Sequence, residues 1–151
     1  MEMKKGVERV ALRAAILILA LTAALKMASL WVFWKRAGAA GLDQADPLFP
    51  FLSGRAMFAL AIVLEWTVLL VLVHAKSRWI QYGSLAWLAT VFAAYHGMMS
   101  RLGRSCHCTG LWPGERWMTH PALTLGLLII LLVIGWSGVG LALFEESRSH
   151  G

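Results

Sequence analysis

The stretch WMTHPALTLGLLIILLVIGWSGVGLALF, residues 117–144, decides the fold, because it holds no charged side chain between Arg116 and Glu145. A helix rises about 1.5 Å per residue, so about 20 apolar residues cross the ~30 Å hydrocarbon layer of a bilayer. The stretch is longer than that. It therefore predicts a membrane-spanning helix, which we place at residues 121–144.

Three further apolar stretches precede this one along the chain. Residues 79–100 are uncharged between Arg78 and Arg101, whereas the apolar stretches at residues 14–34 and 56–75 each contain one formal charge. The first of these stretches belongs to a helix expected at about residues 12–34. Each stretch is long enough to cross a bilayer as a helix. We therefore expect an all-α fold, an integral membrane four-helix bundle in which the whole chain forms a single transmembrane domain.

The composition indicates the same class of protein. Hydrophobic residues make up 59% of the 151-residue chain and charged residues 15%, against roughly 45–50% and 25% in ordinary soluble domains. A soluble domain of this size could not hide so much apolar surface, whereas a lipid bilayer accepts it. The composition excludes a disordered tail, a collagen-like repeat, a disulfide-dense miniprotein and a large catalytic domain outside the membrane. Residues 1–151 are thus expected to form one domain.

The connecting segments fit four helices. Residues 35–55 are rich in Gly and Pro, which disfavours a continuous helix there. Residues 75–78 form a very short link, so the helices on either side of it should make an antiparallel hairpin. The loop at residues 101–120 contains both cysteines and is the least lipid-like part of the chain.

Basic residues near the N-terminus set the expected orientation. Four of them precede the first apolar stretch: Lys4, Lys5, Arg9 and Arg13. With this cluster included, seven basic residues lie on the N-terminal side and six on the opposite side. The concentrated cluster decides the orientation, because the first helix usually dominates and positive charge favours the cytoplasm. We expect a multi-pass protein of the bacterial inner (cell) membrane, with a cytoplasmic N-terminus and a periplasmic or extracellular loop at residues 101–120. A cleaved signal peptide also fits this beginning, but the apolar character continues beyond Lys26.

Lys26 and Glu65 are the two charges inside apolar stretches. Each would cost on the order of 2.5–3.5 kcal/mol alone at the centre of a membrane helix. Lys26 lies ~18 Å from the inner end of its stretch and Glu65 ~14 Å from the outer end, so the two depths agree within a turn. We therefore expect a side-by-side pair. Its role stays open between a salt bridge that fixes helix pairing and a proton relay or polar contact for a quinone or substrate.

The segment SCHCTG, residues 105–110, is the best candidate for chemistry. Cys106 and Cys108 are the two cysteines of the chain, and a disulfide between them would close a small, strained ring. Such a ring constrains the unfolded chain little, so redox exchange suits it better than stabilisation. His107 and nearby arginines favour the reactive thiolate, and the expected outer face is the oxidising side.

Metal binding is the alternative use of the same loop. Cysteine and histidine are ligands for Cu(I) or zinc. The candidate ligands are Cys106, His107, Cys108, His96 and His120. Their spacing matches neither a four-cysteine nor a Cys2His2 zinc site. For His96 and His120, packing or hydrogen bonding at a helix end is the competing interpretation.

These residues together resemble the MauE branch of the MauE/DoxX family of redox-associated membrane proteins. The likeness covers about residues 10–144 and rests on a lysine late in the first span, a glutamate in the second, and Cys-x-Cys-x-Gly before the fourth. The matching residues are Lys26, Glu65, Cys106, Cys108 and Gly110. His107 stands where the family has a small residue, and Thr109 where it has an apolar one.

The resemblance implies a DoxX-like bundle that assists disulfide formation or maturation of an exported protein. The family's namesake is tied to the methylamine dehydrogenase small subunit, which is the type of client implied for methylamine utilisation. The chain becomes a candidate thiol-disulfide oxidoreductase, with Cys106, Cys108 and His107 in the catalytic roles. Relatives that lack the cysteines imply a quinone as the electron partner, by analogy.

The expected partners are therefore the lipid bilayer, an exported or periplasmic thiol or disulfide protein, and a quinone, with no nucleic acid among them. Two other functions remain open. One is a copper- or zinc-handling membrane protein that uses the same loop. The other is a non-catalytic assembly subunit of a larger membrane complex.

Overall fold

Four helices make up the described part of the fold. The computed structural model describes residues 2–35, 44–102 and 121–149. The helices are α1 (Glu2–Lys35), α2 (Gly54–His74), α3 (Arg78–Arg101) and α4 (Pro121–Ser149). The all-α class expected from the sequence is confirmed.

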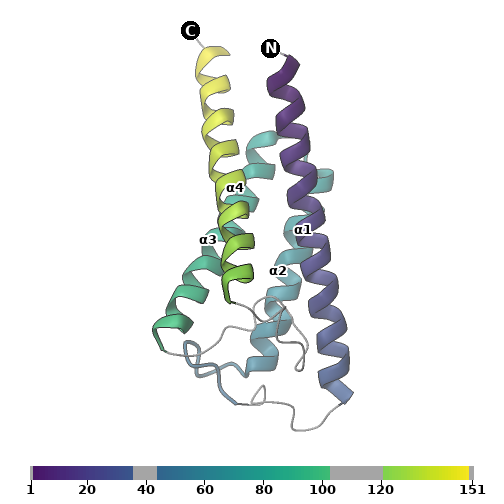
Figure 1. Cartoon of the computed structure of the whole chain (residues 1–151), viewed down its shortest axis with the longest axis vertical. Helices are drawn as coiled ribbons and strands as arrows, with labels where there is room; N and C mark the ends of the chain where they lie inside the picture. The colour runs from purple at the N-terminus through teal and green to yellow at the C-terminus, as the bar shows by residue number, and fades with distance from the viewer. Residues whose placement is uncertain (1, 36–43, 103–120, 150–151) are drawn as a thin grey trace.

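The helices run alternately up and down and form a ring of neighbours (Figure 1). α1 packs against α2, α2 against α3, α3 against α4, and α4 returns to α1. The beginning of α1, the end of α4 and the α2–α3 connection lie toward one end of the bundle, here called the terminal end. The end of α1, the beginning of α2, the end of α3 and the beginning of α4 lie at the other, here called the loop end.

Three helices are long and apolar enough to cross a membrane, through Arg9–Trp31, Gly54–His74 and Leu125–Phe144. α3 does not reach that standard, although residues 79–100 carry no charge. Its hydropathy is lowered by uncharged polar and amphipathic side chains. These are Gln81, Tyr82, Ser84, Thr90, Tyr95 and His96. The expectation of four apolar spans therefore holds for three helices. For α3, the absence of charge led to an overestimate of its hydropathy.

α1 and α4 continue beyond their apolar stretches. α1 begins at Glu2, well before residue 12, and α4 runs past residue 144 to Ser149. Charged residues end an apolar stretch without ending a helix, because Lys, Arg and Glu are good helix formers. As a result, both helices project beyond the α2–α3 connection in Figure 1.

The connection between α2 and α3 is a capped antiparallel hairpin, as the short link predicts. The side-chain amide of Gln81 donates to the carbonyl oxygens of Leu72 and Ala75, over 2.9 and 2.8 Å. The last carbonyl groups of a helix lack partners within it, so these bonds complete the end of α2. At the other end of α2, the Ser53 hydroxyl accepts from the Ala56 amide and caps the first turn.

α3 and α4 make the closest helix contact. A Cβ atom added to Gly135 would lie 2.7 Å from the Cα of Ala86, and one added to Gly138 would overlap the ring of Tyr82. Small residues at a helix interface let two backbones approach closely. The two glycines therefore set the spacing between α3 and α4.

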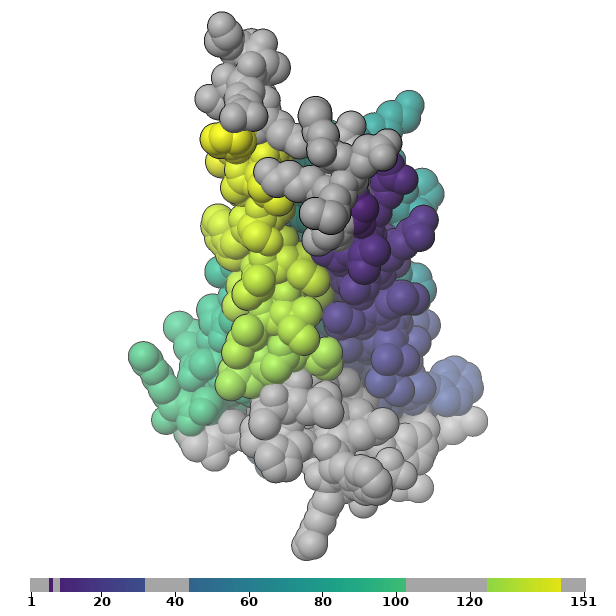
Figure 2. Space-filling model, turned by 45° about the horizontal axis from the view of Figure 1, so that its top comes forward, coloured from purple at the N-terminus to yellow at the C-terminus, as the bar shows by residue number. Residues whose placement is uncertain are grey.

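The exterior of the bundle is apolar, unlike that of a soluble protein, and two charged side chains lie within a largely apolar interior. Large apolar side chains point outward from several helices, with Leu17 69%, Val63 60% and Val133 62% exposed. Lys26 and Glu65 are buried instead. Figure 2 shows one such outer face, where α1 and α4 lie side by side. The apolar core between the helices is formed by Ala15, Leu19, Val68, Leu69, Leu72, Leu85, Leu88, Ala89 and Leu131.

Candidate functional site

The two charges from the apolar stretches meet inside the bundle. Lys26 Nζ lies 2.5 Å from Glu65 Oε1, in an ion pair between α1 and α2. The two side chains are 1% and 3% exposed. The contact expected from their matched depths is confirmed. Its role, as a salt bridge that fixes helix pairing or as a functional group, stays a prediction.

Helical spacing explains why both charges point inward. Lys26 follows Leu19 and Ala23 on the buried face of α1, at intervals of three and four residues. Glu65 lies between Ile62 and Val68 on the buried face of α2, also at intervals of three. Residues with these intervals share one face of a helix. Neither charge can therefore turn to the outer surface without rotating its helix.

The Lys26 ammonium also faces α3. Its Nζ lies 4.8 Å from the centroid of the Phe92 ring, within the range of a cation–π contact. Glu65 Oε2 has no hydrogen-bond partner among the described residues. The pair thus combines one cation with two partners and one buried acceptor oxygen. Such a group can join three helices, and it can also accept a hydrogen bond or a proton.

A quinone does not fit at this pair in the observed arrangement. Its carbonyl oxygens need hydrogen-bond donors and a flat space for the ring. The Lys26 ammonium is already placed between Glu65 and the Phe92 ring, and the pair is almost completely buried. The expected quinone contact at Lys26 and Glu65 therefore has no support in the geometry, and no step is assigned to a quinone there.

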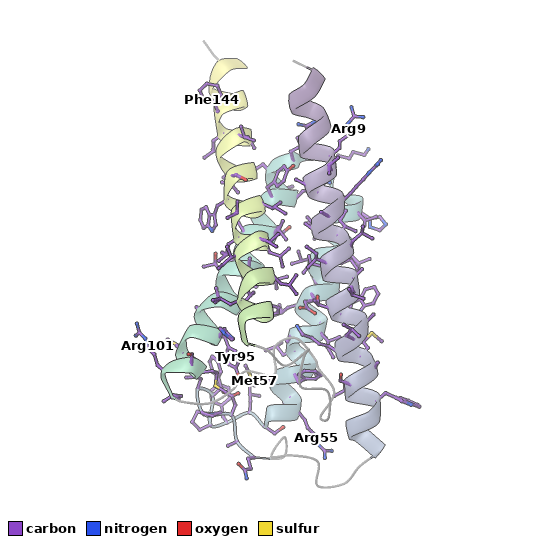
Figure 3. The ribbon with its side chains drawn as sticks, in the orientation of Figure 1. Arg9, Arg55, Met57, Tyr95, Arg101 and Phe144 are labelled. Atoms are coloured by element: carbon purple, nitrogen blue, oxygen red, sulfur yellow. The ribbon has the colours of Figure 1, made fainter. Side chains whose placement is uncertain are left out.

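A second polar contact lies at the loop end, around Asp46. Its carboxylate accepts from the amides of Leu48 and Phe49, at 2.9 and 3.0 Å, and from the hydroxyl of Tyr95 on α3, at 2.5 Å. Asp46 is 4% exposed. The first two bonds are those of an Asx turn, which fixes the backbone after an aspartate. The third ties residues 44–53, here called the α2 lead-in, to the lower part of α3 (Figure 3).

His96 is the one metal-ligand candidate that the structure describes. It follows Tyr95 on α3, is partly buried, and its Nδ1 atom is buried with no hydrogen-bond partner among the described residues. The other four candidate ligands, Cys106, His107, Cys108 and His120, lie outside the described residues. Within residues 2–35, 44–102 and 121–149, no three His, Cys, Asp or Glu side chains come together as a metal site.

The two helix ends that flank the cysteine-containing segment in the chain lie close to the α2 lead-in along the bundle axis (Figure 1). α3 gives way to Leu102 and α4 begins at Pro121, and both points lie at the loop end of the bundle. The α2 lead-in lies at this same end. The basic first turns of α1 lie at the opposite end, where Arg9 is labelled in Figure 3. The geometry of Cys106 and Cys108 themselves lies outside the described residues.

Sequence patterns did not single out Asp46, Tyr95 or Phe92. One signal for Asp46 was present, because Asp followed by Pro47 favours the start of a turn. No local pattern links Asp46 to Tyr95, since the two are 49 positions apart in the chain. Phe92 could not be distinguished in the sequence from the other apolar residues of its helix. Its role is visible only in the structure, where the packing of α3 places its ring beside the Lys26 ammonium.

The fold and these contacts define an all-helical bundle with a buried ion pair and an apolar exterior. Comparison of the chain with protein-family models, with curated proteins and with solved structures finds no match in any of the three.

Proposed function

We propose that this chain is a membrane-embedded thiol-disulfide redox protein of the MauE/DoxX type. The observation that carries the proposal is the position of the two helix ends that flank the Cys-x-Cys segment in the chain. The end of α3 and the beginning of α4 both lie at the loop end, away from the basic N-terminal turns of α1. If those basic turns face the cytoplasm, the cysteines face the oxidising side.

The polarity of the bundle supports the membrane part of the proposal. Three helices are long and apolar enough to cross a bilayer. Their outer faces expose large apolar side chains, and the two charges within the apolar stretches, Lys26 and Glu65, are paired inside. An unpaired charge at mid-membrane depth is costly, and pairing removes most of that cost. α3 would be the fourth span, with its polar groups turned toward its neighbours or the membrane surface.

The proposed chemistry is a thiol-disulfide exchange in which the client is oxidised and the Cys106–Cys108 pair is reduced. A client thiolate attacks one sulfur of an oxidised Cys106–Cys108 pair, and the other cysteine leaves as a thiolate. The second client thiolate then attacks the mixed disulfide, so the client gains a disulfide and the loop becomes a dithiol. Exchange with a second disulfide carrier returns the pair to its oxidised form. His107 favours the thiolate form of its neighbours.

The test is to trap the mixed disulfide. The Cys108→Ser variant keeps the Cys106 thiolate, which can attack the disulfide of an oxidised client in the reverse of the proposed exchange, but it lacks the second cysteine that would break the resulting mixed disulfide. We expect it to accumulate a covalent complex in cells, which disappears on reduction and whose partner mass spectrometry identifies as an exported protein. The Cys106→Ser/Cys108→Ser variant is the matched control. If neither single-cysteine variant traps a partner, the redox proposal is wrong.

Metal handling is the second candidate, favoured by the buried Nδ1 of His96, which has no hydrogen-bond partner in the described part of the chain. Imidazole nitrogen and thiolate together suit Cu(I) or zinc. Purified protein would then contain stoichiometric metal, which both Cys106→Ser and His96→Phe should remove. Metal-free protein that still traps a client would exclude this function.

A further inference from the structure

The α2 lead-in presents an apolar tip at the loop end of the bundle. Between Asp46 and Arg55 it contains no charged residue, and its tip is formed by Leu48, Phe49, Pro50 and Phe51. Phe51 is 80% exposed and Phe49 39%. Their rings pack edge to face, with centroids 5.9 Å apart. Two adjacent phenyl rings held away from the core are unfavourable in bulk water.

The tip is held in a fixed shape by hydrogen bonds at its base. The amide of Asp46 donates to Leu52 O over 2.7 Å, and the amide of Leu52 donates to Phe49 O over 2.8 Å. Ala45 pairs with Ser53 in an antiparallel bridge. The Asp46 carboxylate adds the turn bonds and the bond to Tyr95 described above. The Phe49–Phe51 pair therefore lies on a hydrogen-bonded turn that is bonded to α3 through Tyr95.

The length of α2 gives the depth of this tip. Its 21 residues span ~31 Å at about 1.5 Å per residue, which matches the ~30 Å hydrocarbon layer. When α2 is centred in a bilayer, Gly54 lies at the edge of the hydrocarbon. The tip lies just before Gly54 in the chain, at the level of the lipid headgroups. Aromatic and aliphatic side chains without charge bind favourably at that boundary.

We propose that Leu48, Phe49, Pro50 and Phe51 form an interfacial anchor that dips into the headgroup layer on the loop side of the membrane. The ligand of this surface is the lipid itself, because the tip is apolar, uncharged and placed at the bilayer edge by α2. Through the Asp46–Tyr95 bond, the anchor also fixes the part of α3 that leads to Leu102. The proposal rests on the membrane part of the proposed function and is independent of the thiols.

Spin labels at three positions test the depth of the tip. In a Cys106→Ser/Cys108→Ser background, Phe51→Cys, Leu60→Cys and Gln44→Cys each receive one nitroxide. The proteins are reconstituted into vesicles of phosphatidylcholine and phosphatidylglycerol, without any other protein. Relaxation by oxygen reports lipid exposure, and relaxation by a water-soluble nickel complex reports water exposure. We expect the oxygen-to-nickel ratio at residue 51 to be several-fold above that at residue 44 and below that at residue 60.

Other results would overturn the anchor in distinguishable ways. A ratio at residue 51 equal to that at residue 44, with residue 60 exposed to lipid, removes the anchor and leaves the membrane bundle intact. Residue 60 exposed to water would contradict the membrane part as well. Spin–spin broadening at residue 51 would assign the tip to contact with a second copy. Nickel protection that appears only after adding membrane extract would assign it to a protein partner.

A further variant in the same experiment tests the hydrogen bond between Asp46 and Tyr95 of α3. Tyr95→Phe removes the hydroxyl that donates to Asp46 and leaves the tip residues unchanged. We expect faster label motion at residue 51 and a lower oxygen-to-nickel ratio there, with no change at residue 60. An unaltered ratio and mobility at residue 51 would show that the bond to Tyr95 does not hold the tip in the headgroup layer.

Discussion

Lys26 and Glu65 show how a single contact can tolerate charge inside an apolar bundle. Each group alone in the interior would carry a large desolvation cost, which the opposite charge offsets only while both remain in place. The 2.5 Å ion pair therefore couples the register of α1 to that of α2. The Phe92 ring extends the coupling to α3.

Removing one partner of this pair should destabilise the bundle more than removing both. Glu65→Gln leaves a buried ammonium without its counter-ion, and a loss of about 3–5 kcal/mol is typical for a broken buried pair. Lys26→Met leaves an unpaired carboxyl and should also lower stability. The double variant has no charge at this depth and should recover part of the loss. Thermal unfolding in detergent micelles or vesicles measures all four proteins.

Thr67→Val provides a matched control for this cycle. Thr67 lies on the exposed side of α2, where its hydroxyl donates to Val63 O of the same helix, so little change is expected. A double variant no more stable than the worse single variant would contradict the pairing.

The Asp46–Tyr95 bond makes a local prediction. Tyr95→Phe leaves a buried carboxylate oxygen without its donor, at a cost of about 1–3 kcal/mol. We expect the amides of Leu48 and Phe49 to exchange hydrogen faster, since Asp46 holds both. Ser84→Ala on the same helix is the control, because its hydroxyl bonds Gln81 O within α3. Equal exchange in the two variants would refute a holding role for Tyr95.

At this scale, the sequence predicts contacts between helices better than contacts made by loops. Lys26 and Glu65 could be paired beforehand because a straight helix converts residue number into depth. Asp46 and Tyr95 could not, since the turn that buries Asp46 depends on a bond to a residue far away in the chain. The quinone contact expected at Lys26 has no support in the observed packing, and the contact of Lys26 with Phe92 could not be predicted because it depends on how α3 is placed relative to α1.

At the scale of helices, the spacing between α3 and α4 depends on two glycines. Gly135→Ala places a methyl group against the backbone of Ala86, and Gly138→Ala places one against the Tyr82 ring. Each should destabilise by about 1–3 kcal/mol through overpacking. Gly140→Ala meets nothing within 4 Å and should be neutral or stabilising, by up to about 1 kcal/mol of helix propensity.

Unfolding of the three glycine variants in micelles gives the comparison directly. If Gly140→Ala is as harmful as Gly135→Ala, close approach of α3 and α4 is not what the glycines provide.

The helices also show which features of an element can be read from charge. The uncharged stretch predicted the position of α3 correctly, but it did not predict how apolar the helix is. Gln81, Tyr95 and His96 lower the hydropathy of α3 without adding charge. The presence of charge ended the apolar stretches of α1 and α4 but not the helices. Apolar stretches and helices are set by different properties of the side chains.

At the scale of the whole molecule, the up-and-down order of the helices predicts where both chain ends lie. α1 begins and α4 ends at the terminal end of the bundle. With the basic turns of α1 in the cytoplasm, the end of α4 must be cytoplasmic too. A fluorescent protein fused after residue 151 should therefore fluoresce, and an alkaline phosphatase fused there should be inactive. Active phosphatase at this point would reverse the orientation and place the cysteines inside.

The central claim concerns two thiols on the outer side of a membrane bundle, and the most direct measurement is alkylation of Cys106 and Cys108 in intact cells. A membrane-impermeant maleimide polymer is added with and without prior reduction. We predict that both cysteines of the native protein resist the reagent until a mild reductant is added, and that they become protected again after the reductant is removed. Cysteines that react at once without reductant, or that react only after the membrane is opened, would contradict a redox pair on the outer face.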